Sequence, residues 1–230
     1  MHLTLLLLQV ADTTAAATTG STTSLSLWEL YKLGGWLFMI PLTVLSVLAV
    51  YVFIERYIAI TTASKIDKTF MDQIQTYMLR GDIQLATNLC QQQNTPIARM
   101  VEKGIKRLGK PLRSIEVAIE NEGKLELMKL EKNLAILATV AGVAPMIGFL
   151  GTVTGMITAF YQISNAGSTV DPSMLAGGIY QALITTAAGL IIGIPAYIGY
   201  NFLVNMVEKV VFKMEATSVG FVDFLQEPAK

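Results

Sequence analysis

The sequence predicts an all-α membrane protein with three transmembrane helices, because it contains three long uncharged stretches. Residues 134–164 and 174–206 each exceed the roughly 20 apolar residues that a helix needs to cross a bilayer. Residues 36–54 form the third stretch, nearer the N-terminus. From residue 133 to residue 207 the sole charged residue is Asp171, between the two longer stretches. We interpret the three stretches as membrane spans and Asp171 as a solvated loop residue.

The basic residues predict the orientation, since cytoplasmic loops carry an excess of Lys and Arg. Thirteen lie in residues 55–132 and three follow the last span, whereas none precedes Lys32 and none lies in the loop after the second span. We therefore expect the N-terminus outside and the C-terminus in the cytoplasm. The predicted parts are a periplasmic tail with an interfacial helix (1–35), the first span (36–54), a cytoplasmic helical region (55–133), the second span (134–164), a periplasmic loop (165–173), the third span (174–206) and a cytoplasmic C-terminal helix (207–230).

The N-terminal part begins with an apolar segment followed by Ala- and Thr-rich sequence. We favour a retained periplasmic tail over the alternative, a signal peptide cleaved after Ala17, because no basic residue lies near the start. Ser26 and Glu29 have the spacing of a capping box and predict a short amphipathic helix that carries Trp28 at the membrane interface. The first span that follows lacks a stripe of small residues, so we expect it to face lipid.

The cytoplasmic region is predicted to be helical, with breaks at Gly81, at Asn94-Thr95-Pro96 and at Gly109. From Leu112 we expect one continuous helix into the second span, with charges such as Glu126 and Lys129 on solvated faces. The third span should likewise continue inward, and the extensions should pack as a bundle. Its stripe follows helical spacing: Val207, Val211, Met214, Ser218, Phe221 and Leu225.

Small residues occupy one face of each of the two longer spans. Such faces let helices approach closely in lipid, where no hydrophobic force drives association. One explanation is that the two faces pack only against each other; the other is that they line a lumen filled by water or by another helix. Polar groups among them favour the lumen, because lipid cannot satisfy hydroxyls and amides. The faces are Ala141, Pro145, Gly148, Thr152, Gly155 and Ala159 in the second span, and Gly178, Ala182, Thr185, Gly189, Gly193 and Ala196 in the third, flanked by Gln181 and Thr186.

Two motifs in these spans carry a resemblance to a known family. The run APMIGFLGTVTGMITAF (144–160) and the run GGIYQALITTAAGLIIGIPAYIGYN (177–201) closely resemble the ExbB/TolQ proteins, which belong to the wider ExbB/TolQ/MotA proton-channel family. The Gly-Thr pair at Gly151, the pattern QAL-x-T-T-A-x-GL and the ending IPA-x-x-x-YN are specific in combination. The resemblance implies a multi-pass protein of the bacterial inner membrane that forms a homopentamer around the transmembrane helices of a small ExbD/TolR-like partner. A TonB/TolA-like protein that spans the periplasm is a further possible partner.

The resemblance also implies roles for individual residues. Thr152 and Thr186 match the two threonines that line the channel in the family, and Thr185 adds a third hydroxyl. Gln181 stands where many members carry Glu, and an amide cannot titrate in the working range. With the proton as coupling ion, the resemblance therefore leaves the protonatable group to an Asp on the partner's helix.

The residue inventory argues against other classes of function. One cysteine, Cys90, and one histidine, His2, leave no histidine-based catalytic site or metal cluster in the folded part. We see no nucleophile–base set, no phosphate loop and no basic patch with interleaved aromatics, so we expect no enzyme, no metal, no cofactor and no nucleic acid. The hypotheses that remain are a subunit of a proton-driven motor complex, a self-sufficient proton or ion channel or secondary transporter, and a passive membrane scaffold.

Overall fold

The computed structural model describes residues 26–65, 69–165 and 172–226, and within these ranges every regular element is a helix. The all-α prediction is therefore confirmed. The N-terminal tail, the loop with Asp171 and the last four residues lie outside the described residues. The helices are α2 (Leu27–Leu33), α3 (Trp36–Ala63), α4 (Phe70–Leu79), α5 (Ile83–Gln93), α6 (Pro96–Ile105), α7 (Leu112–Glu131), α8 (Leu134–Asn165) and α9 (Pro172–Gln226).

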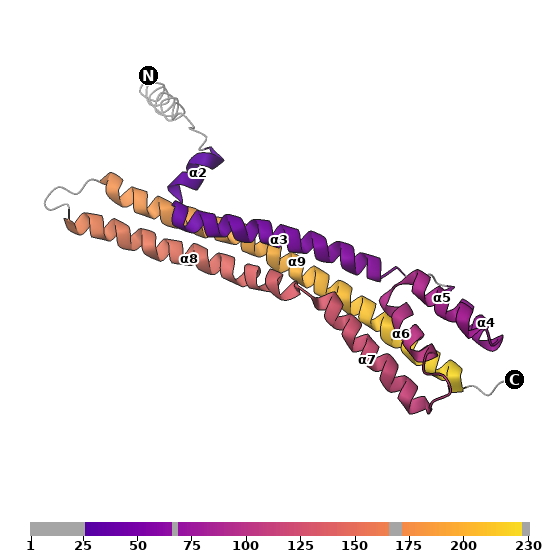
Figure 1. The fold of residues 1–230 in the computed structure, drawn as a ribbon. Helices are drawn as coiled ribbons and strands as arrows, with labels where there is room; N and C mark the ends of the chain where they lie inside the picture. Colours follow the sequence, from indigo (N-terminus) through magenta and orange to yellow (C-terminus); the bar gives the residue numbers. More distant parts are fainter. Residues whose placement is uncertain (1–25, 66–68, 166–171, 227–230) are drawn as a thin grey trace, which may run out of the picture.

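Three apolar helical segments are long enough to cross a membrane, as predicted: they belong to α3, α8 and α9. These helices run side by side in Figure 1, and α9 extends along the whole bundle. The shorter helices α4 to α7 gather around the C-terminal part of α9. The outer side of α3 carries apolar residues exposed on the isolated chain, among them Val47 at 66% and Tyr51 at 63%. That surface suits contact with lipid.

The predicted local signals appear at both ends of the shorter helices. Ser26 and Glu29 form the capping box of α2. Thr95 caps α6 by accepting a hydrogen bond from the Ala98 amide at 3.3 Å, and Pro96 occupies the first turn. The predicted breaks also coincide with left-handed backbone, with φ of 77° at Gly81, 44° at Asn94 and 83° at Gly109. A residue with positive φ cannot continue a right-handed helix, and Gly and Asn adopt positive φ most easily. The sequence therefore predicted these breaks correctly.

The expected continuous helix from Leu112 into the second span is wrong, because the chain breaks between α7 and α8. Lys132 is extended, with ψ of 135°, and Asn133 is left-handed, with φ of 63°. Side chains from α3 bind at this break: Arg56 Nη1 donates to the Lys129 carbonyl at 3.2 Å, and Asn133 Nδ2 donates to Glu55 Oε2 at 3.2 Å. Arg56 of α3 thus satisfies the Lys129 carbonyl, which would otherwise lack a hydrogen-bond partner at the end of α7. Figure 1 shows the resulting change of direction.

The interpretation of Glu126 as part of a solvated face is also wrong, whereas it holds for Lys129. Glu126 is 1% exposed, and its carboxylate accepts a hydrogen bond from Arg99 Nε at 2.9 Å and one from Lys129 Nζ at 2.6 Å. Burial acts to raise the pKa of Glu126, but the hydrogen bonds and charges of Arg99 and Lys129 outweigh it and lower that pKa. The Lys129 side chain is 63% exposed. Packing of α6 on α7 creates this pair, which joins residues 27 apart in sequence.

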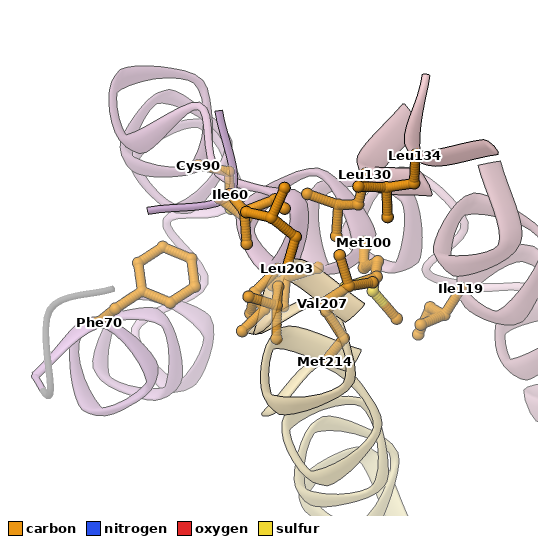
Figure 2. Close-up of a cluster of buried hydrophobic side chains, with 14 of the residues drawn as sticks. Ile60, Phe70, Cys90, Met100, Ile119, Leu130, Leu134, Leu203, Val207 and Met214 are labelled. Atoms are coloured by element: carbon orange, nitrogen blue, oxygen red, sulfur yellow. The ribbon is translucent and has the colours of Figure 1, made fainter. Parts of the chain in front are cut away.

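A continuous hydrophobic core joins the base of the membrane spans to the helical extension (Figure 2). The predicted α9 stripe contributes Val207, Met214 and Phe221, each at most 4% exposed. Cys90 lies in the same core at 1% exposed, and burial raises the pKa of its thiol to about 12, with Glu102 adding to the shift. A buried thiol with that pKa has little nucleophilic thiolate at neutral pH. The side chains labelled in Figure 2 are Ile60, Phe70, Cys90, Met100, Ile119, Leu130, Leu134, Leu203, Val207 and Met214.

Candidate functional site

The small faces of α8 and α9 pack directly against each other within the chain. A Cβ added to Gly148 would lie 2.8 Å from the Thr185 carbonyl oxygen, and one added to Gly189 would lie 2.6 Å from the Ala144 carbonyl oxygen. At Gly155 a Cβ would lie 2.8 Å from the Gly178 carbonyl oxygen. The neighbouring atoms are backbone, which cannot move aside without shifting a helix. The spacing of the two backbones therefore depends on glycine at these positions.

The faces predicted from helical spacing correspond closely to this contact. Seven of the ten non-hydroxyl members are buried and the other three are half-buried. The prediction missed Ala144 and Gly151, which are buried in the same contact, because helix packing uses positions on both sides of the central row. The buried members are Gly148, Gly155, Ala159, Ala182, Gly189, Gly193 and Ala196, and the half-buried ones are Ala141, Pro145 and Gly178. The packing explanation thus holds within one chain, and a lumen shared with other chains stays a prediction.

Thr185 lies inside the contact and is 0% exposed. Its Oγ1 donates within α9, to the Ala182 carbonyl at 2.9 Å and to the Gln181 carbonyl at 3.1 Å. A Cβ at Gly151 would collide with the Thr185 hydroxyl group. In the isolated chain this hydroxyl is satisfied by its own helix, so its direct effect is on helix packing.

Thr186 and Thr152 lie at the edge of the same contact, and both are half-buried. Thr186 Oγ1 donates to the Gly148 carbonyl at 3.1 Å and so bonds α9 to α8. Thr152, one turn after Gly148, donates to the Phe149 carbonyl at 2.6 Å. A shallow hollow on the outside of α8 begins at Thr152 and continues over Val153, Met156, Ile157 and Phe160. Each hydroxyl keeps an oxygen that can accept a further hydrogen bond.

Gln181 is half-buried and lies on the other flank of the contact, about 140° around α9 from Thr186. There it meets the turn between α2 and α3: a Cβ at Gly35 would lie 2.6 Å from Gln181 Nε2. Sequence patterns gave no signal for this contact, since Gly35 and Gln181 are far apart along the chain. The side-chain amide of Gln181 forms no hydrogen bond with any described residue; the bond from Thr185 goes to the backbone carbonyl of Gln181.

The four polar candidates lie within one range of depth along the helix pair, about one and a half helical turns, although they point in different directions. The register of the contact sets this depth, because Gly151 lies opposite Thr185 and Gly155 lies opposite Ala182. No Asp, Glu, Lys, Arg or His occurs in α8, nor in α9 before Glu208. The described residues contain no group of His, Cys, Asp or Glu that could hold a metal ion. The band formed by Thr152, Gln181, Thr185 and Thr186 can therefore exchange hydrogen bonds but cannot take up charge.

Comparison with known proteins identifies the family. Residues 92–216, which include α8, most of α9 and all four polar candidates, match the model of the MotA/TolQ/ExbB proton channel family. The chain belongs to this family. The MotA/TolQ/ExbB resemblance of the two motifs is thus confirmed. The family description is that of a proton channel and not of an enzyme.

Several curated members of the MotA/TolQ/ExbB family are similar to this chain. A putative biopolymer transport protein ExbB homolog of Methanothermobacter thermautotrophicus is 27% identical over 81% of this chain and 66% of its own length. The biopolymer transport protein ExbB of Aquifex aeolicus is 45% identical over 43% of this chain and 67% of its own length. The Tol-Pal system protein TolQ of Haemophilus influenzae is 46% identical over 36% and 38%, respectively. The chain thus spans about two thirds of the first two relatives and less of the third.

Proposed function

We propose that this chain is a non-enzymatic subunit of an inner-membrane complex that converts the proton motive force into work. The observation that carries the proposal is the polar band within about one and a half turns of the α8–α9 pair, which offers an amide and hydroxyls but no group that changes protonation. Membership in a family of proton channels supports a path for protons at this place. A chain with such a band needs a protonatable group from elsewhere to complete the path.

The partner that we propose is an ExbD/TolR-like protein with one membrane helix that carries an Asp. A charge that crosses the whole field gains about 2.3 kcal/mol per 100 mV. To use this energy a carboxyl group must bind and release the proton in turn, and burial raises the pKa of a carboxyl group so that it is neutral for part of the cycle. Gln181, Thr152 and Thr186 would hydrogen-bond this Asp in its neutral or charged form, since amides and hydroxyls both donate and accept.

We further propose a homopentamer around the partner's helices, in a bacterial inner membrane, with the N-terminus in the periplasm and the C-terminus in the cytoplasm. The concentration of Lys and Arg in residues 55–132 supports this orientation. Biopolymer transport, which the names of two relatives state, fits such a complex. A TonB/TolA-like protein would then carry the work across the periplasm, with no metal or nucleic acid involved.

The test is proton flux into liposomes that contain the purified chain, with and without an ExbD/TolR-like single-span partner. We expect flux only when both proteins are present, and none when the partner's intramembrane Asp is replaced by Asn. Flux from the chain alone, at the rate of the full complex, would refute the shared site and support the alternative, a self-sufficient proton or ion channel or secondary transporter.

A further inference from the structure

The turn between α2 and α3 lies against Gln181. Gly35 precedes α3 with φ of 81° and ψ of 128°, a conformation that residues with a Cβ rarely adopt. A Cβ on Gly35 would lie 2.6 Å from Nε2 and 3.5 Å from Cδ of Gln181. The amide therefore rests on the α-carbon of Gly35, where there is no room for a side chain.

The neighbouring glycine contacts the same strip of α9. A Cβ on Gly34 would collide with Cε of Met39 in the first turn of α3, and it would lie 3.1 Å from Cγ2 of Ile184, which follows Gln181 by three residues. Residues three apart on a helix share a face. Gly34 has an ordinary φ of −69°, so its small size serves this contact and not the backbone conformation. Two contacts thus seat the turn on α9 at the depth of the polar band.

The turn is joined to an ordered helix on its outer side. In α2 the rings of Trp28 and Tyr31 stack with centroids 5.9 Å apart, and Lys32 Nζ lies 5.6 Å from the Trp28 ring centroid. Thr43 Oγ1 on α3 donates to the Met39 carbonyl at 2.8 Å and lies 3.5 Å from the Tyr31 hydroxyl, so α2 also contacts the first turns of α3. Trp28 is 64% exposed, and an exposed Trp beside a Lys suits the membrane interface.

The Gln181 amide is placed by contact and not by a hydrogen bond to any described residue. Within the part of the chain that the structure describes, its donors and its acceptor are unused, so they can bind a group of another chain. A glutamine side chain has several rotatable bonds, and ordering it on binding costs conformational entropy. A surface that restricts the side chain beforehand lowers this cost, which is the general advantage of preorganisation.

We propose that Gly35 is a positioning residue and that the α2–α3 turn holds the Gln181 amide in the place where the partner's carboxyl group meets it. This inference rests on the proposed function and adds to it a part of the chain outside the two motif-bearing spans. It makes the interfacial helix α2 a support of the polar band, since the turn and the helix form one ordered unit.

The experiment measures partner-dependent proton flux in liposomes for Gly35→Ala. We expect at least a tenfold loss, because the new methyl group displaces the amide. Two controls separate the contact from the backbone strain of a positive φ: Gly109→Ala has a similar φ of 83° with nothing within 4 Å of its added Cβ, and Gly177→Ala lies one turn before Gln181, also with nothing within 4 Å. The flux of each control should stay within twofold of wild type. In the double variant Gly35→Ala/Gln181→Asn the shorter amide withdraws from the methyl group. Its flux should rise above that of Gly35→Ala and reach that of Gln181→Asn alone.

If Gly35→Ala does not assemble with the partner, a second set of variants tests whether the α2–α3 turn positions the Gln181 side chain. In a Met39→Ala background, which removes the side chain that a Cβ on Gly34 would meet first, Gly34→Leu pushes the turn away from Ile184 without positive φ. Flux should fall relative to Met39→Ala alone, and Ile184→Ala in the same chain should restore it. Wild-type flux in Gly35→Ala, or a double variant no better than its glycine single variant, would overturn the positioning role. Absence of flux in the wild-type complex would instead refute the proposed function, so the two failures are distinguishable.

Discussion

Replacing Gly189 with alanine tests whether α8 and α9 approach as closely as the structure shows. The new Cβ would lie 2.6 Å from the Ala144 carbonyl oxygen and 3.1 Å from the Gly148 α-carbon. Both atoms belong to the backbone of α8, so relief requires the two helices to separate. The matched control is Gly142→Ala, also within a span, where nothing lies within 4 Å of the added Cβ.

The two substitutions share one favourable effect and differ in one unfavourable effect. Alanine in place of glycine inside a helix stabilises the folded state by about 0.5–1 kcal/mol, because the unfolded chain loses conformational freedom. Overpacking a tight contact costs about 1–3 kcal/mol. We therefore expect Gly142→Ala to raise the free energy of unfolding, and Gly189→Ala to lie about 1–3 kcal/mol below Gly142→Ala.

Reversible unfolding of both variants in the same detergent micelles measures this difference directly. Because the helix-propensity effect is common to both, the difference between the variants isolates the collision at Gly189. Equal stability of the two variants would show that α8 and α9 have room at this position. Glycine at this position would then not be what sets the distance between α8 and α9 or the register of the polar band.

Three further predictions concern orientation, polarity and a buried charge. In a Cys90→Ser background, Ser168→Cys should react with an impermeant thiol reagent added outside the inner membrane, whereas Ser114→Cys should react only after permeabilisation; the reverse pattern would overturn the orientation. Gln181→Asn should keep part of the partner-dependent proton flux and Gln181→Leu should abolish it, since hydrogen bonding is required there; equal flux in the two would refute this. Glu126→Ala should lower the free energy of unfolding by about 3 kcal/mol at neutral pH, the low end for a broken buried pair, because the arginine partner is partly exposed. Since the pKa of Glu126 is lowered in the folded state, its stabilisation is present above the ordinary carboxyl pKa and is lost as the pH falls through the lowered value, so wild type and variant should converge in acid.

The sequence alone determined the features that depend on short-range patterns. Long uncharged runs place the three spans, because a bilayer admits helical segments of limited length and low polarity. The helix caps and breaks at Ser26, Thr95 and Gly109 depend on residues within a few positions of one another, so local sequence was enough to predict them. The two motifs of the longer spans were sufficient to indicate the family, which the match over residues 92–216 confirms.

The tertiary structure alone decided which distant groups meet. The break at Asn133 exists where Glu55 and Arg56 of another helix bind it, and periodicity along α7 carries no record of that contact. Glu126 is buried because α6 brings Arg99 to it, although a charged residue in a helical stripe is usually solvated. Gly35 reaches Gln181 because the bundle folds α2 and α3 back along α9. Each of these contacts joins residues far apart in sequence, so helical spacing places each residue on a face of its own helix, and the packing of the helices determines what that face meets.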